Sequence, residues 1–121
     1  MKRILAVDDD QSMTDLYRAL LTDAGYEVLT APEAVAASQA LASFKPDLVI
    51  LDAEMPGGGG EKVFESGGGL LKSGLPLIFV TGLPERVEKL ALKFPNVGVM
   101  AKPVKAEELL SVIAELIGPG A

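Results

Sequence analysis

Short apolar runs recur along the chain at intervals that suit strands separated by helices. Five such runs have strand length: Ile4 to Val7, Val28 to Ala31, Leu48 to Leu51, Leu77 to Val80, and Val97 to Ala101. They are largely continuous rather than alternating, which is typical of parallel strands covered by helices on both faces. We expect the strands at the edges of this sheet to be the least apolar.

The segment after the first run has the clearest helical periodicity. Its apolar positions follow steps of three and four residues: Met13, Leu16, Tyr17, Leu20, Leu21 and Ala24. Ser12 is predicted to cap the start of this helix, with Asp15 three residues later as in a capping box. Gly25 is expected just beyond its end. Asp10 is interpreted as a surface or helix-capping charge.

Three later segments are also predicted as helices that bury one face. The second segment runs from Pro32, placed at its first helical position, and has Val35, Leu41 and Phe44 as its larger apolar groups. The fourth begins at Pro84 and stops at Pro95, and its apolar stripe is Val87, Leu90, Ala91 and Phe94. The fifth precedes Gly118, and its stripe is Leu109, Val112, Ile113, Leu116 and Ile117.

The third segment is interrupted by glycine. Apolar positions that fit a helical face are Val63, Phe64, Leu70 and Leu71, but Gly67, Gly68 and Gly69 lie between them, and a second cluster spans Gly57 to Gly60. Each interior glycine costs about 1 kcal/mol relative to alanine. We expect a broken or shortened helix and a mobile region inside the domain.

Five strands alternating with five helices predict a doubly wound α/β fold with a parallel sheet. The length of 121 residues suits one domain. In such sheets ligands bind beyond the carboxyl ends of the strands, where the strand order reverses. Candidate chemistry is therefore sought among the residues that end each apolar run.

Composition narrows that chemistry. The chain has no Cys, His or Trp, which excludes disulfides, thiolate or imidazole catalysis and the usual zinc sites. Its net charge of −6, with no basic patch, predicts no direct binding to nucleic acid or anionic membranes. No apolar run is long enough for a signal peptide or a membrane span. We expect a cytoplasmic location.

Charged and hydroxyl side chains follow four of the five runs. Asp8 and Asp9 follow the first, Asp52 the third, Thr81 the fourth and Lys102 the fifth. Because parallel strands end at one edge, these side chains should converge. Three carboxylates in one place repel one another, and Mg²⁺ together with the lysine would balance them. Mg²⁺ is the expected cofactor.

With these residues the chain resembles the response-regulator receiver domain, the CheY-like phospho-acceptor module of two-component signalling. The resemblance covers essentially the whole chain. It rests on the acidic pair, the run LDAEMPGGGG with Asp52, Met55, Pro56 and Gly60, the VTG containing Thr81, and Lys102 before Pro103. It implies a flavodoxin-like (βα)5 three-layer sandwich with strand order 2-1-3-4-5.

The resemblance also implies roles for the site residues. Asp52 would attack a phosphoryl group and become an aspartyl phosphate. Asp9 and Asp52 would ligate Mg²⁺ together with the backbone carbonyl of Glu54, while Asp8 would act mainly through bound water. Met55 and Pro56 would serve as turn and packing elements rather than in chemistry.

Further residues would serve the transferred group and its donor. Lys102 and Thr81 would contact the phosphoryl oxygens, and Gly82 would leave room for the donor. The donor would be a histidine kinase or phosphotransfer protein, whose phosphohistidine must come from outside these 121 residues. Transfer would switch interactions with an unknown output domain or target, with a phosphorylation-dependent homodimer as a further arrangement.

The same resemblance raises a question about signal output. The family commonly carries an aromatic residue three positions before the lysine, and here that position is Val99. We hypothesise that output depends on other packing shifts of the fourth helix and fifth strand. Residues 1–118 are assigned to the receiver domain, and residues 119–121 to a tail or the start of a linker. The domain is expected to be a signalling module rather than an enzyme.

Two other functions stay open. A haloacid-dehalogenase-like phosphatase would use Asp8 and Asp10 as an Asp-x-Asp pair, but it lacks the downstream acidic metal ligands and leaves Asp52 unexplained. A degenerate receiver would only bind a partner. Phosphate-loop and calcium-loop interpretations fail, because Gly57 to Gly60 lacks a Gly-Lys-Ser/Thr signature and Met13 replaces the glycine of a calcium loop.

Overall fold

The computed structural model describes residues 1–54, 74–88, 92 and 94–120. Its elements in chain order are β1 (Arg3–Val7), α1 (Gln11–Asp23), β2 (Glu27–Ala31), α2 (Ala34–Phe44), β3 (Leu48–Asp52), β4 (Leu77–Thr81), the 3₁₀ helix η1 (Pro84–Arg86), β5 (Val97–Ala101) and α5 (Ala106–Ile117). The five predicted strands are all present, each within one residue of its apolar run.

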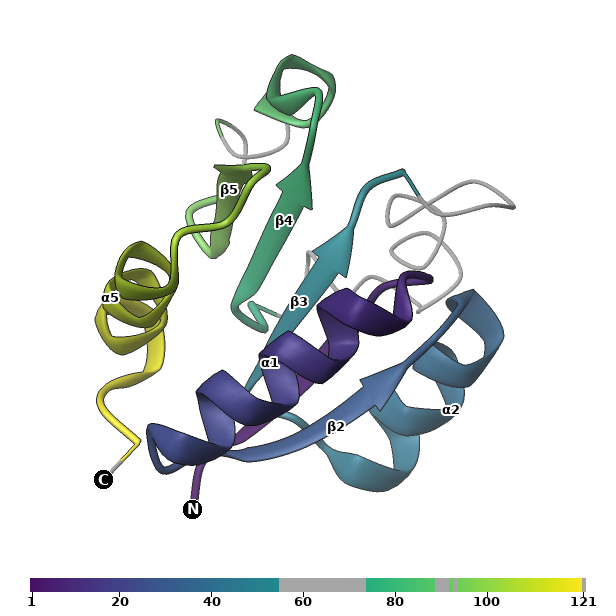
Figure 1. The fold of residues 1–121 in the computed structure, drawn as a ribbon, viewed down its shortest axis with the longest axis vertical. Coiled ribbons are helices and arrows are strands. Elements are labelled where there is room, and N and C mark those ends of the chain that lie inside the picture. The colour runs from purple at the N-terminus through teal and green to yellow at the C-terminus, as the bar shows by residue number, and fades with distance from the viewer. Residues whose placement is uncertain (55–73, 89–91, 93, 121) are drawn as a thin grey trace.

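The strands form one parallel sheet in the order β2-β1-β3-β4-β5, as the resemblance implied. Side chains of β1 alternate between the two faces. Ile4 and Ala6 pack with α1 and α5, whereas Leu5 and Val7 pack with α2. Helices thus cover both faces, which confirms a doubly wound, three-layer arrangement (Figure 1).

Burial follows the position of each strand in the sheet. Every residue of β3 and β4 is buried, because both strands have neighbours on either side. The edge strands β2 and β5 are only partly buried, and Leu29 of β2 is exposed. The edge strands are therefore the least buried. The prediction that they would also be the least apolar holds for β2, which contains Glu27 and Thr30, but not for β5, which has no polar side chain.

The predicted start of α1 is wrong by two residues, whereas its end is confirmed. Asp10 is the N-cap in place of Ser12, and its carboxylate accepts the Ser12 N–H at 2.9 Å. This confirms the helix-capping alternative for Asp10. The helix begins at Gln11, so Ser12 already lies inside it and its amide needs an acceptor. At the other end Gly25 has φ +96°, and its N–H donates to the Thr22 carbonyl.

Two residues expected in the core are exposed. Leu16 is 45% exposed because α1 faces the sheet through Thr14, Tyr17 and Leu21, which leaves Leu16 at the margin of that face. Val35 is 64% exposed because α2 packs through the small residues Ala37 and Ala40. The stripe of α5 is confirmed, with Leu109 and Ile113 fully buried.

The remaining helix predictions are tested only in part. Pro32 precedes the N-cap Glu33 of α2 rather than opening the helix, since the Glu33 carboxylate already accepts the first free amides. Helical structure does begin at Pro84, in η1. Several predicted positions lie outside the described residues: the third segment with Gly57 to Gly60 and Gly67 to Gly69, Met55, Pro56, Leu90 and Ala91.

Among the described residues, no helix combines the length and apolar character needed to cross a bilayer.

The contrast between two leucines of α1 gives a test of this packing. Leu21→Ala should lower the free energy of unfolding by about 2–5 kcal/mol, because it leaves a cavity under a fully buried side chain. Leu16→Ala should cost less than about 1 kcal/mol, because Leu16 is already in contact with water. Urea denaturation followed by circular dichroism measures both. Equal losses would contradict the orientation of α1.

Candidate functional site

The predicted site residues meet at the carboxyl edge of the sheet. Asp52 ends β3 and Thr81 ends β4, while Asp8 directly follows β1 and Lys102 directly follows β5. These four strands are neighbours, so the sheet brings their ends together. Asp8, Asp52 and Thr81 are each at most 3% exposed. The residues that end or directly follow these apolar runs therefore form one cluster, as the sequence predicted.

Three carboxylates form the acidic half of the site. Asp8, Asp9 and Asp52 each offer an oxygen, and these oxygens lie within 4.8 Å of one another. One Asp8 oxygen accepts the Asp10 N–H at 2.9 Å, but the other is buried and has no hydrogen-bond partner. Burial, reinforced by the charge of Asp52, raises the pKa of Asp8 to about 6.

This acidic cluster fits a hard divalent cation. A buried, unpaired carboxylate oxygen beside two further carboxylates is unfavourable unless a cation compensates it. Mg²⁺ prefers oxygen ligands and commonly takes only one or two carboxylates, with waters completing its octahedron. Asp8, Asp9 and Asp52 therefore provide the right donor atoms, and Asp8 provides the unpaired oxygen that such an ion or its water would satisfy.

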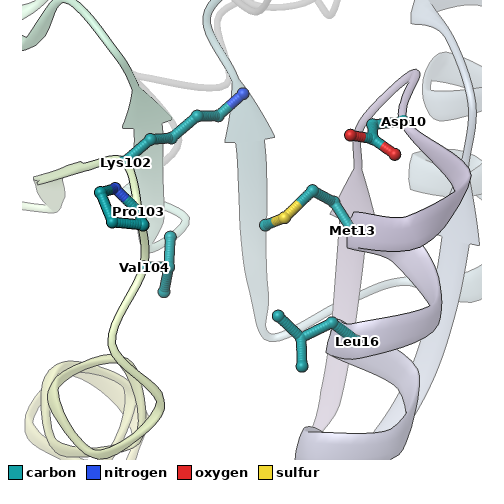
Figure 2. Close-up of a pocket in the computed structure, with 6 residues that line it drawn as sticks. All are labelled: Asp10, Met13, Leu16, Lys102, Pro103 and Val104. Atoms are coloured by element: carbon teal, nitrogen blue, oxygen red, sulfur yellow. The ribbon is translucent and has the colours of Figure 1, made fainter.

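Lys102 supplies the positive charge that reaches the Asp52 carboxylate. Its Nζ lies 3.2 Å from Asp52 Oδ1 and 3.7 Å from Glu54 Oε2. Figure 2 shows its side chain extending from the segment after β5 toward the end of β3. Partial burial opposes its charge, but the contacts with Asp52 prevail and raise the pKa of Lys102. The group is an ammonium at neutral pH.

The Glu54 side chain is a participant that the sequence did not reveal. Only its backbone carbonyl was predicted to act, yet its Oε1 accepts the Thr81 hydroxyl at 2.6 Å and the Gly82 N–H at 2.8 Å. The Thr81 hydrogen bond, with help from Gly82 and Lys102, lowers the pKa of Glu54. An acid two residues after Asp52 was the available signal, but no sequence pattern fixes its rotamer.

This arrangement changes the expectation for Gly82. A Cβ placed on Gly82 would lie 3.5 Å from Glu54 Oε1, so the space beside this glycine holds the Glu54 carboxylate rather than lying open to a donor. The Glu54 backbone is anchored separately, because its N–H donates to Asp52 Oδ1 at 3.0 Å. Whether its carbonyl ligates Mg²⁺ stays a prediction.

A groove adjoins the site on the side of α1. It encloses about 440 Å³ between the first turns of α1 and the segment joining β5 to α5 (Figure 2). The residues that line it are Asp10, Met13, Leu16, Lys102, Pro103 and Val104. The exposed Leu16 therefore contributes to a largely apolar surface that reaches Lys102, rather than to the core.

Sequence comparisons place this geometry among known proteins. The family model described as the response regulator receiver domain matches residues 4–114. The transcriptional regulatory protein YrkP of Bacillus subtilis, described as uncharacterized, is 41% identical over 94% of this chain and 49% of its own length. The DNA-binding response regulator MtrA of Mycobacterium tuberculosis is 31% identical over 91% of this chain and 48% of its own.

The chain spans about half the length of these curated relatives. Because MtrA is described as DNA-binding, the expectation that no nucleic acid is bound finds no support among the relatives.

Solved structures show the same fold over nearly their full length. The chemotaxis protein CheY4 of Vibrio cholerae has a TM-score of 0.84 and 28% identity, covering 97% of this chain and 99% of its own. The response regulator TrrA of Thermotoga maritima, solved in complex with Mg²⁺ and BeF, has a TM-score of 0.82 and 31% identity. The match covers 97% of this chain and 100% of TrrA.

Removing the charge of Asp8 should stabilise the protein when divalent cations are chelated. At pH 7, Asp8→Asn should raise the free energy of unfolding by up to about 3 kcal/mol, since the pKa of Asp8 lies roughly two units above its ordinary value and one unit corresponds to about 1.4 kcal/mol. The folded-state pKa of Asp8 is raised, so wild-type stability recovers as pH falls through about 6. The advantage of the variant should therefore shrink at pH 5.

Urea titrations in EDTA at the two pH values measure this difference. Adding Mg²⁺ should stabilise the wild type at pH 7 but stabilise Asp8→Asn much less, because the cation loses one charged partner. A variant that is less stable than wild type in EDTA at pH 7 would show that the Asp8 charge is already compensated within the chain.

Proposed function

The chain belongs to the response regulator receiver domain family, and from that premise we propose that Asp52 is its phosphoryl acceptor. The observation that carries this proposal is the position of Asp52, buried between an acidic cluster and the Lys102 ammonium. A carboxylate in that position can be held ready for attack on phosphorus while the neighbouring charges accommodate the incoming anion.

In the proposed transfer, one bond to phosphorus forms as another breaks. An Asp52 carboxylate oxygen forms a bond to phosphorus, and the bond from phosphorus to the donor breaks. With a phosphohistidine donor the imidazole leaves, and with acetyl phosphate acetate leaves. The chain contains no histidine, so within these residues it is the acceptor half of the reaction. We propose a histidine kinase or phosphotransfer protein as the donor.

Mg²⁺, when bound, would neutralise charge on the phosphoryl oxygens. The residues that would hold it are Asp9 and Asp52, with the Glu54 carbonyl, while Asp8 acts through a bound water. TrrA, solved with Mg²⁺ and BeF, supports this assignment as a structural relative. The unpaired Asp8 oxygen supports it from this chain.

Lys102 and Thr81 are proposed to contact the transferred group. The ammonium of Lys102 already contacts Asp52. The Thr81 hydroxyl lies at the same edge of the sheet, where it donates to Glu54. Both would stabilise charge that spreads over the phosphoryl oxygens during transfer. The site would thus promote modification of its own carboxylate. Water would reverse this modification by hydrolysis, which restores the Asp52 carboxylate and releases inorganic phosphate, so the chain acts as a signalling module.

The two alternatives are disfavoured by the side chains around Asp8. A phosphatase using Asp8 and Asp10 needs both at the reaction centre, but the Asp10 carboxylate is the N-cap of α1 and accepts hydrogen bonds from the Ser12 N–H and hydroxyl. A degenerate receiver would lack part of the site, whereas all five predicted side chains are present and four strands position them.

Signal output is proposed to pass through Thr81 and the segment that follows it. The Leu83 N–H donates to Thr81 Oγ1 at 2.9 Å, which links the site to η1. Val99 pairs with Phe79 in the sheet and is only partly buried. Since valine cannot act as an aromatic switch, packing changes of this region would carry the signal.

The proposal also covers the bounds of the receiver domain and the contacts that it makes with other proteins. Residues 1–118 form the receiver domain, which is supported by the end of α5 at Ile117 and by a hydrogen bond from the Tyr26 hydroxyl to the Gly118 carbonyl. Residues 119–121 would be a tail or the start of a linker. Phosphorylation would change contacts with an output domain or target protein, or between two copies of the chain.

Asp52→Asn should abolish labelling. Wild-type protein incubated with Mg²⁺ and acetyl phosphate should gain the mass of one phosphoryl group, measured by intact-protein mass spectrometry under mildly acidic conditions. Asp10→Asn should be labelled like wild type, because asparagine also caps helices well. Labelling that persists in Asp52→Asn, or that is lost in Asp10→Asn, would instead favour the phosphatase-like site.

Beryllofluoride with Mg²⁺ should shift amide resonances well beyond the Asp52 pocket. We expect changes in residues 84–94 and 97–110, because Thr81 connects the site to η1 and β4 pairs with β5. Two-dimensional ¹⁵N NMR measures these shifts. Changes restricted to the immediate neighbours of Asp52 would contradict the proposed route of output.

A further inference from the structure

We propose that the Glu54 carboxylate is an internal competitor of the phosphoryl group, holding Thr81, Gly82 and Lys102 until an incoming phosphoryl group displaces it. The inference rests on the proposed function of Asp52 and extends it to a residue whose side chain that function does not use. It makes Glu54 a positioning residue that sets how readily the site accepts its anion.

The contacts of Glu54 are those that a phosphoryl group would need. One carboxylate oxygen accepts the Thr81 hydroxyl at 2.6 Å and the Gly82 N–H at 2.8 Å. The other lies 3.7 Å from Lys102 Nζ, which itself lies 3.2 Å from the acceptor Asp52. A tetrahedral anion on Asp52 and this carboxylate would both require Thr81 and Lys102.

The Glu54 carboxylate and a phosphoryl group on Asp52 cannot favourably occupy the same contacts, because both groups are anions. Like charges at hydrogen-bond distance repel strongly where water is partly excluded, and Thr81 is fully buried. A hydroxyl has one proton to donate, so Thr81 can serve Glu54 or a phosphoryl oxygen, but not both. Binding of the phosphoryl group therefore requires the Glu54 side chain to leave.

The structure gives Glu54 a way to leave without disturbing the site. Its backbone N–H is held by Asp52 Oδ1 at 3.0 Å, independently of its side-chain contacts. Its side chain is 28% exposed, so rotation about its own bonds can carry the carboxylate into water. Displacement thus breaks two hydrogen bonds and an ion pair while leaving the Glu54 backbone N–H on Asp52.

The competition can be measured as affinity for beryllofluoride, an analogue of the phosphoryl group. In saturating Mg²⁺, Glu54→Ala should bind it at least tenfold more tightly than wild type, because in the wild type the contacts of Glu54 with Thr81, Gly82 and Lys102 must first be broken. Tenfold in affinity corresponds to about 1.4 kcal/mol. Glu54→Gln should lie between them, because its amide oxygen still accepts from Thr81 but carries no charge.

Asp10→Asn is the matched control for loss of one negative charge. Asp10 lies at the same edge of the sheet and lines the groove beside Lys102. In the described part of the chain, its carboxylate accepts hydrogen bonds from Ser12, whereas Thr81 and Gly82 donate to Glu54. The affinity of Asp10→Asn for beryllofluoride should differ from that of the wild type by less than about threefold, as expected for a screened charge. A larger effect of Glu54→Ala than of Asp10→Asn therefore reports competition rather than charge alone.

The Gly82 amide gives a second readout, which reports on the contact with Glu54 even before beryllofluoride is added. Its proton resonance in ¹⁵N NMR should lie downfield in wild type, where it donates to a carboxylate, and should move upfield in Glu54→Ala. Beryllofluoride should move both the Gly82 and the Thr81 resonances of the wild type. In Glu54→Ala, the hydrogen bond from Gly82 to residue 54 is already absent before beryllofluoride is added.

Three results would overturn the inference, and they are distinguishable. Equal affinities of Glu54→Ala and Asp10→Asn would refute competition, and an unchanged Gly82 resonance in Glu54→Ala would refute the contact itself. Either can occur while Asp52 still binds beryllofluoride, which leaves the proposed function standing. Failure of all four proteins to bind it in saturating Mg²⁺ would refute the proposed function and this inference together.

Discussion

The balance of charge around buried Asp52 is the constraint on which the rest of the site depends. Asp52 is 3% exposed and shares the end of the sheet with Asp8, which is 1% exposed. Two carboxylates buried this deeply need compensating cations, because water reaches them poorly. Lys102 compensates Asp52 from one side, and the acidic cluster offers a place for Mg²⁺ on the other. Each neighbour of Asp52 therefore has an electrostatic reason for its position.

The fold produces this balance because parallel strands all end at one edge. Four adjacent strands deliver a carboxylate, a second carboxylate, a hydroxyl and an ammonium to the same place, although they lie far apart in the sequence. Every residue of β3 and β4 is buried, so close packing fixes the positions of Asp52 and Thr81. The more exposed residues, Lys102 and Glu54, are the ones left to respond when an anion arrives.

Much of this arrangement could be predicted from the sequence, because it follows from backbone direction. Apolar runs locate the strands, and the residue that ends each run must lie at the common edge. What could not be predicted depends on local rotamers and on helix phase. Ser12 and Asp10 both satisfy the rules for an N-cap, and only the first helical residue decides between them. Leu16 fits an apolar stripe but lies at its margin. Likewise, the sequence pattern does not determine whether the Glu54 carboxylate faces Thr81 or water.

The most direct test is a crystal structure of the chain with Mg²⁺ and beryllofluoride. We predict beryllofluoride on the Asp52 carboxylate, with its fluorines in contact with Thr81 and Lys102, and Mg²⁺ held by Asp9 and Asp52. The Glu54 side chain should have left Thr81 and Gly82. Beryllofluoride bound away from Asp52, with Glu54 still accepting the Thr81 hydroxyl, would contradict both the assignment of the acceptor and the role of Glu54.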